Sequence, residues 1–145
     1  QLGDLGQRAM CLNNIGEIFR AKGNYPEALK RYEEALQLAE QLGHLREKAT
    51  LLNNIATIHY AQENYPEALK RYEEALQLAE QLGHLSGKAM RLNNIATIHY
   101  AQGNYPEALK RYEMALEILT RIGLGDSPNA NIFRDNIKSI KSKMS

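Results

Sequence analysis

The sequence predicts an all-α fold in which helical hairpins stack side by side into a solenoid. Three observations lead to this prediction. The chain repeats itself every 40 residues, each repeat holds two stretches with helical spacing of apolar residues, and proline and glycine mark the ends of those stretches. A pair of short helices cannot bury a core alone, so each hairpin must be covered by its neighbours.

The repeats are close copies of one another. Residues 24–45 match residues 64–85 at every position, which is closer than separately drifting duplicates usually remain. This likeness indicates recent amplification or deliberate engineering. We therefore divide the chain, taken as a single domain over 1–145, into repeats at 1–40, 41–80 and 81–120 and a capping region at 121–145.

The middle repeat shows the two helices most clearly. Apolar or half-apolar residues recur at helical spacing from Leu45 to His59, and again from Ala68 to Ala79. Pro66 falls in the opening turn of the second helix, where its missing N–H costs nothing. Small residues should lie where the helices cross, at Gly16, Ala56 and Ala96 in the first helices and at Ala28, Ala68, Ala108, Ala35, Ala75 and Ala115 in the second.

The turns between helices differ at one position. Gly23 and Gly103 end their first helices with a residue that enters the left-handed region freely, whereas the middle repeat has Glu63 there. We expect Asn64, the next residue, to adopt the left-handed conformation instead.

The last segment departs from the repeat and predicts a capping helix. Ser127 and Pro128 read as its cap and first turn. One stripe of the helix is apolar, and lysines occupy much of the rest. The stripe consists of Ala130, Phe133, Ile137, Ile140 and Met144.

Composition excludes several classes of function. The 18 basic and 17 acidic side chains leave a net charge of +1, so charge does not favour nucleic acid or a membrane surface. Cys11 is the only cysteine, which excludes an internal disulfide and favours a packed thiol in a cytoplasmic protein. His59 and His99 lie one repeat apart, too far to share a metal. We expect no cofactor, no metal and no enzymatic activity.

The residues of the middle repeat resemble the tetratricopeptide repeat, which is a helical hairpin with fixed large, small and aromatic positions. Its 40 residues, against the usual 34, are similar to the longer-helix variety of cargo-adaptor and cell-polarity scaffolds. The resemblance implies a right-handed superhelical solenoid of three hairpins plus a capping helix. His59 and His99 depart from the pattern, since the family usually has tyrosine or another bulky residue at this position. The residues that match are Leu52, Ile55, Ala56, Tyr65, Ala68, Tyr72 and Ala75.

The candidate binding surface lies on the first helices. Residues 49–62 have no charged side chain, whereas residues 66–80 have many, so the first helix should be the inner one. The resemblance implies that an asparagine ladder at Asn14, Asn54 and Asn94 lines a concave peptide groove. The full candidate set is Asn13, Asn14, Asn53, Asn54, Thr57, Tyr60, Asn93, Asn94, Thr97, Tyr100 and Asn136.

Two alternatives stay open at this point. The asparagines could instead bond neighbouring helices to one another, since primary amides both donate and accept hydrogen bonds. The chain could also be an engineered array with no evolved ligand. Expected partners are therefore a protein or peptide on the concave face, or none, with self-association as end-to-end or swapped dimers through an uncapped amino end.

Overall fold

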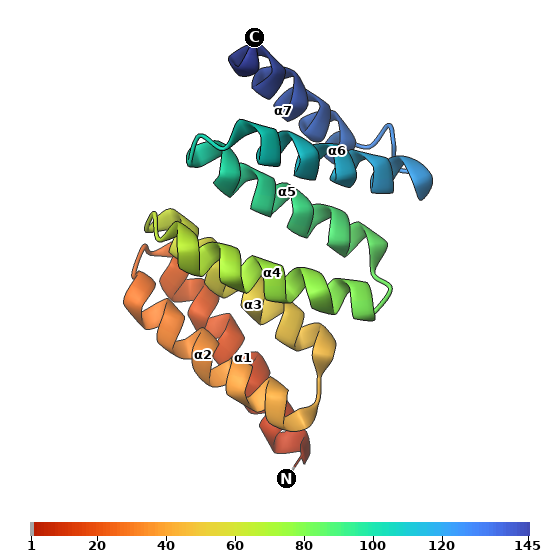
Figure 1. Ribbon diagram of the computed structural model, residues 1–145. Coiled ribbons are helices and arrows are strands. Elements are labelled where there is room, and N and C mark those ends of the chain that lie inside the picture. The colour runs from red at the N-terminus through yellow and green to blue at the C-terminus, as the bar shows by residue number, and fades with distance from the viewer. Residues whose placement is uncertain (1) are drawn as a thin grey trace. The chain divides into compact units, whose positions relative to one another are not determined.

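A computed structural model describes residues 2–145, and all regular structure in that range is helical. The all-α prediction is therefore confirmed. The helices follow one another as shown in Figure 1: α1 (Leu2–Ala21), α2 (Tyr25–Leu42), α3 (Leu45–Ala61), α4 (Tyr65–Gln81), α5 (Leu85–Ala101), α6 (Tyr105–Arg121) and α7 (Pro128–Met144).

The chain forms two compact units, which divide between Leu78 and Ala79. In the first unit α1 packs against α2, and α2 packs against α3. In the second unit α5 packs against α6, and α6 packs against α7 (Figure 1). In the first unit α2 thus lies between α1 and α3, and in the second unit α6 lies between α5 and α7. The repeat boundaries and the single domain stay predictions from the sequence.

The core of the first unit joins α2 to α3. Tyr32 and Leu36 of α2 are buried together with Leu52 and Ile55 of α3. The small residues expected at the helix crossings are fully buried, namely Ala28, Ala35, Ala56, Ala68, Ala75, Ala96, Ala108 and Ala115.

Gly16 takes the place of these alanines in the first repeat because Tyr32 lies against it. A Cβ atom on Gly16 would be 2.7 Å from Cε1 of the Tyr32 ring, closer than carbon atoms pack. The ring is fully buried. The first hairpin is therefore packed more closely at this point than an alanine would allow.

The capping helix forms as predicted, with one exception. The N–H of Ala130 donates to Oγ of Ser127 at 3.2 Å, and Pro128 begins the helix. Ala130, Phe133 and Ile140 are buried, whereas Met144 is 48% exposed at the end of the helix. The prediction that Met144 belongs to the packed stripe was wrong, because the helix ends at this residue.

The turn after α3 corrects another expectation. Glu63 itself has φ 61°, and Asn64 does not take over the left-handed conformation. The reason is the hydrogen bond from the N–H of Asn64 to the carbonyl of His59, at 2.8 Å, which closes the end of α3 around residue 63. Asn24 makes the same bond to Phe19 at 2.9 Å across Gly23.

Replacing Glu63 with glycine should stabilise the chain by about 0.5–1 kcal/mol, because a side chain in the left-handed region costs about 1–2 kcal/mol and glycine recovers part of this. Urea denaturation measures the change as a higher midpoint. Gln62→Gly is the matched control: Gln62 has φ −88°, so glycine there should lower the midpoint. An unchanged or lower midpoint for Glu63→Gly contradicts the prediction.

Candidate functional site

In the first unit the candidate residues lie on α1 and α3. Asn14 is exposed, while Asn13, Asn53 and Asn54 are half-buried. Nδ2 of Asn54 donates a hydrogen bond to Oδ1 of Asn13 at 3.2 Å, across the two helices. Asparagines of neighbouring repeats therefore bond each other at this place, as in the alternative in which the amides join neighbouring helices. One bond uses only part of the hydrogen-bonding capacity of each amide.

The threonines of the candidate surface hold the hairpins together. Oγ1 of Thr57 donates to the carbonyl of Asn53 at 2.9 Å and lies 2.8 Å from the Tyr72 hydroxyl on α4. Thr97 repeats the arrangement in the second unit, with distances of 3.0 Å to the Asn93 carbonyl and 2.9 Å to the Tyr112 hydroxyl. The contacts of Thr57 and Thr97 with tyrosines of the second helices were not predicted, because helical spacing alone does not reveal bonds between helices.

The tyrosines of the candidate surface pair with the tyrosines that open the second helices. The rings of Tyr60 and Tyr65 are 5.8 Å apart, and those of Tyr100 and Tyr105 are 5.5 Å apart. Tilted rings at this distance attract one another. Tyr60 and Tyr100 remain half-buried, so part of each ring can contact a ligand.

The first repeat replaces these uncharged contacts with an ionic cluster. Glu17 stands where the middle repeat has Thr57, and it accepts hydrogen bonds from the Tyr32 hydroxyl and from Arg20. Burial raises the pKa of Glu17, but the hydrogen bonds from Tyr32 and Arg20 outweigh it, and the pKa falls below its usual value of 4.5. Burial and the bond to Glu17 raise the pKa of Tyr32.

This cluster makes part of the stability pH-dependent. Because the folded-state pKa of Glu17 is depressed, its contribution is complete above 4.5 and is lost as pH falls through the folded-state value. The free energy of unfolding of the parent should exceed that of Glu17→Gln at pH 7 and converge with it in acid. Urea titrations at several pH values measure the difference. A gap between the two proteins that does not change with pH contradicts the assignment.

The second unit carries the remaining candidates. Asn93 and Asn94 lie on α5 and Asn136 on α7, and all three are half-buried. The continuous row of asparagines through all repeats stays a prediction.

A hollow of about 550 Å³ opens in the first unit beside Asn13. Met10 and Asn13 of α1 face Arg46 and Thr50 of α3 across it. Of its lining residues only Asn13 belongs to the predicted candidate set. Two glycines also line the hollow, and a Cβ atom on either would meet nothing within 4 Å, so the space beside α1 is open at Gly3 and Gly6.

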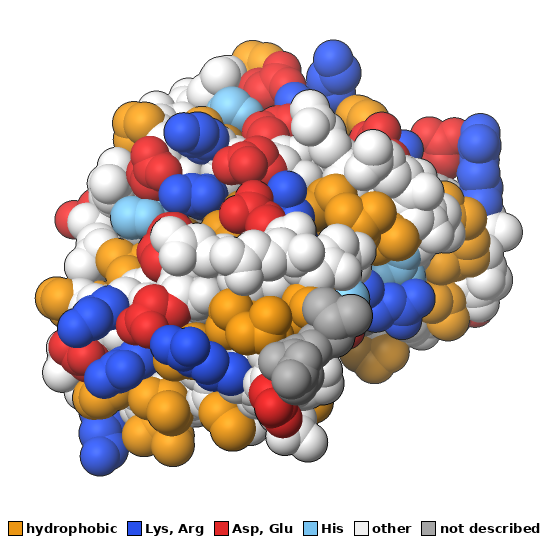
Figure 2. Space-filling view, turned by 90° about the horizontal axis from the view of Figure 1, so that it is seen from below, with side chains coloured by type: hydrophobic (Ala, Val, Ile, Leu, Met, Phe, Trp, Pro, Cys, Tyr) orange, Lys and Arg blue, Asp and Glu red, His pale blue; other side chains and the backbone are white. Residues whose placement is uncertain are grey.

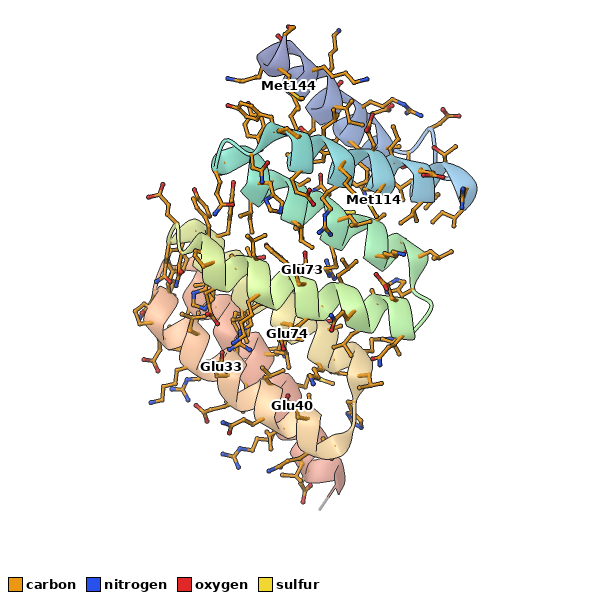
Figure 3. All side chains as sticks on the ribbon, in the orientation of Figure 1. Glu33, Glu40, Glu73, Glu74, Met114 and Met144 are labelled. Carbon is orange, nitrogen blue, oxygen red and sulfur yellow. The ribbon has the colours of Figure 1, made fainter. Side chains whose placement is uncertain are left out.

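The second helices carry charges in ion pairs, as expected of a solvated face. Arg71 on α4 bonds Glu67 one turn away at 3.3 Å and reaches Glu33 of α2 at 3.4 Å. Figure 3 labels Glu33 on α2 and Glu73 and Glu74 on α4. Such half-exposed pairs contribute about 0–1 kcal/mol each.

No metal site or membrane span is found between residues 2 and 145. No three His, Cys, Asp or Glu side chains in that range are grouped to hold a metal ion. Burial lowers the pKa of His59, which is half-buried. Cys11 is exposed, so the expectation of a packed thiol was wrong.

None of the helices in the described range has both the length and the apolar character needed to cross a bilayer.

Comparison with known proteins links this geometry to a family. A family model for the tetratricopeptide repeat matches residues 7–81, 47–121 and 88–134. None of the curated proteins matches the chain in sequence.

Solved structures share the fold at low sequence identity. The apo form of RapI is similar with a TM-score of 0.90 and 14% identity, over 97% of this chain and 39% of RapI. The tetratricopeptide-repeat domain of Arabidopsis FLU gives 0.75 and 20% identity, over 81% of this chain and 98% of that domain. The N-terminal domain of stress-induced protein-1 from C. elegans gives 0.74 and 14% identity, over 94% and 97% of the two chains. This chain spans well under half the length of RapI, and at these identities the likeness shows the fold alone.

Proposed function

Because the chain belongs to the tetratricopeptide-repeat family, whose repeats are protein-interaction scaffolds, we propose that it binds a peptide of a partner protein on the face formed by its first helices. This face is the concave face of the predicted solenoid. The proposed module is not catalytic. The ligand is an extended or helical segment whose backbone bonds the asparagine amides and whose side chains enter the hollow beside α1 and α3.

One observation carries this proposal: the near-identical repeats differ where the hollow lies. Residues 41–80 and 81–120 differ at ten positions, and four of these, Arg46, Glu47, Thr50 and Leu51, line the hollow. A recognition surface that contacts different side chains varies between repeats, and here the variation falls on residues that line an open hollow. The volume of about 550 Å³ also lies within the usual range of ligand sites, about 300–1,000 Å³.

A selection from a phage-displayed library of random dodecapeptides, followed by affinity measurement on the winning peptides, tests the proposal. Replacing Asn54 and Asn94 together with alanine should weaken their binding about tenfold, since each lost hydrogen bond is worth about 0.5–1.5 kcal/mol. Lys70→Ala, on the exposed face of α4, is the matched control and should leave the affinity unchanged.

Circular dichroism and thermal unfolding of each variant separate lost contacts from lost fold, because Asn54 also bonds Asn13. Peptides that bind parent and double variant equally would refute the assignment of the site. Failure to enrich any peptide would favour the alternative of a repeat array without an evolved ligand, which the identity of residues 24–45 and 64–85 supports.

A further inference from the structure

A cluster of charges around Arg71 links α4 to α2 in the first unit. Nη2 of Arg71 lies 3.4 Å from Oε1 of Glu33 on α2, and Nε lies 3.3 Å from Oε1 of Glu67 on α4. Nη1 is 3.9 Å from Oε1 of Glu74, also on α4. We call these four residues the Arg71 cluster. Three carboxylates therefore surround one guanidinium, and one of them belongs to the preceding repeat.

His59 of α3 lies beside the Arg71 cluster. Its side chain is half-buried, and its Nδ1 atom has almost no access to solvent and no hydrogen-bond partner among the described residues. The charges of Glu67, Arg71 and Glu33 all act on the imidazole. They belong to α4 and α2, and both of these helices contact α3. On the face of the molecule seen in Figure 2, histidine side chains likewise lie next to acidic and basic ones.

The fold leaves hydrogen-bonding capacity unused at this place. Nε of Arg71 is within ion-pair distance of Glu67 but not at hydrogen-bonding geometry, and Oε1 of Glu74 is also buried without a hydrogen bond in residues 2–145. Buried polar atoms are nearly always paired, so several unpaired ones together need an explanation. They comprise a donor, an acceptor and the imidazole nitrogen of His59. Such a group can rearrange its pairs when one proton is added.

The first repeat has a side chain without a titratable proton at the same position. Phe19 stands 40 residues before His59 and packs against the core of the first unit. The guanidinium of Arg31 lies 6.0 Å from the centre of its ring. An uncharged aromatic ring therefore fits this place beside the equivalent arginine. In the second unit His99 occupies the position, near the Glu107 carboxylate.

A proton added to His59 needs an acceptor. The neutral imidazole has one N–H group and the imidazolium has two, so protonation turns both ring nitrogens into donors. Burial lowers the pKa of His59 and Arg71 lowers it as well, whereas Glu67 and Glu33 raise it, and the result is a pKa below the usual 6.5. The neutral form therefore suits the fold as it stands. A carboxylate that turns from Arg71 to His59 would pair the charged form.

We propose that His59 and the Arg71 cluster form a pH-sensitive switch in the packing of α4 against α2 and α3. While His59 is neutral, Glu33 and Glu67 hold Arg71, and this arginine links the second helices of the first two repeats. Once His59 is protonated, Glu67 pairs with the imidazolium, Arg71 loses that partner, and the link to α2 loosens. Histidine is the side chain whose charge ordinarily changes between about pH 5 and 8. The switch does not depend on the proposed peptide site.

The switch makes the stability of the first unit depend on pH in one direction. Because the folded-state pKa of His59 lies below the ordinary 6.5, its contribution is complete above 6.5 and is lost as pH falls through the folded-state value. His59→Phe, which copies Phe19, removes the proton and keeps an aromatic ring. Between about pH 7.5 and 5, the urea midpoint of the parent should fall relative to that of His59→Phe. His84→Gln, at an exposed histidine, is the control and should follow the parent.

NMR titration of the full chain tests the mechanism directly. The Cε1–H signal of His59 should titrate with a midpoint below 6.5, and the backbone amides of α2 around Glu33 should shift with the same midpoint. Glu67→Gln removes a carboxylate that favours the charged imidazole, so the midpoint should fall further. Glu40→Gln is the matched control, because Glu40 pairs with Lys48 in the first turn of α3 and should leave the midpoint unchanged.

Several outcomes overturn the proposal. A His59 midpoint at or above 6.5 would do so, and so would α2 amides that do not follow the titration of His59. A midpoint that Glu67→Gln leaves in place would remove the assigned partner. A difference in urea midpoint between parent and His59→Phe that stays constant with pH would show that the proton does not affect packing. If His59→Phe does not fold, the titration of the parent and of Glu67→Gln decides.

Discussion

The structure depends on one constraint, which is that a helical hairpin of this size buries its apolar surface only between neighbours. α2 lies between α1 and α3, and α6 lies between α5 and α7. A first helix such as α3 therefore meets helices on two sides, its own partner and the helix before it. The candidate residues Asn53, Asn54, Thr57 and Tyr60 of α3 carry no charge and are half-buried. Three of them also take part in contacts between helices, Asn54 with Asn13, Thr57 with Tyr72 and Tyr60 with Tyr65.

The buried tyrosines connect the packing to this surface. Tyr32, Tyr72 and Tyr112 occupy equivalent places, and each hydroxyl meets the residue that faces it on the first helix. In the second and third repeats that residue is threonine, and the contact is neutral. In the first repeat that residue is Glu17, which accepts a hydrogen bond from Arg20. Arg20 stands at the position that Tyr60 has in the middle repeat. The residue opposite the tyrosine therefore differs in charge between the first repeat and the later ones, and so does the half-exposed surface around it.

Periodicity predicted the helices and the alanine crossings because both follow from spacing within one repeat. It did not predict contacts that depend on how neighbouring helices meet. Thr57 was expected to face a ligand, yet its hydroxyl contacts Tyr72, and the Asn13 and Asn54 amides meet each other. The hollow was not predicted because periodicity identifies the residues on one face of a helix and not the space between two helices; Gly3 and Gly6 are among the residues that line it. The conformation of Glu63 depends on a backbone hydrogen bond that side-chain preferences do not encode.

Near-identity of repeats does not by itself argue against recognition, because stacking and binding constrain different residues. Residues 24–45 contain the whole of α2 and its turns, and in the first unit this helix packs against both α1 and α3, so its sequence is constrained on two sides. The third copy changes at Glu117, Ile118, Leu119 and Thr120, near the end of α6, and α6 is the helix that meets α7 instead of another full repeat. The other cluster of changes, at residues 46–51, lies along the hollow. Variation is therefore confined largely to places where the neighbour differs, and both clusters of changes include residues that line an open hollow.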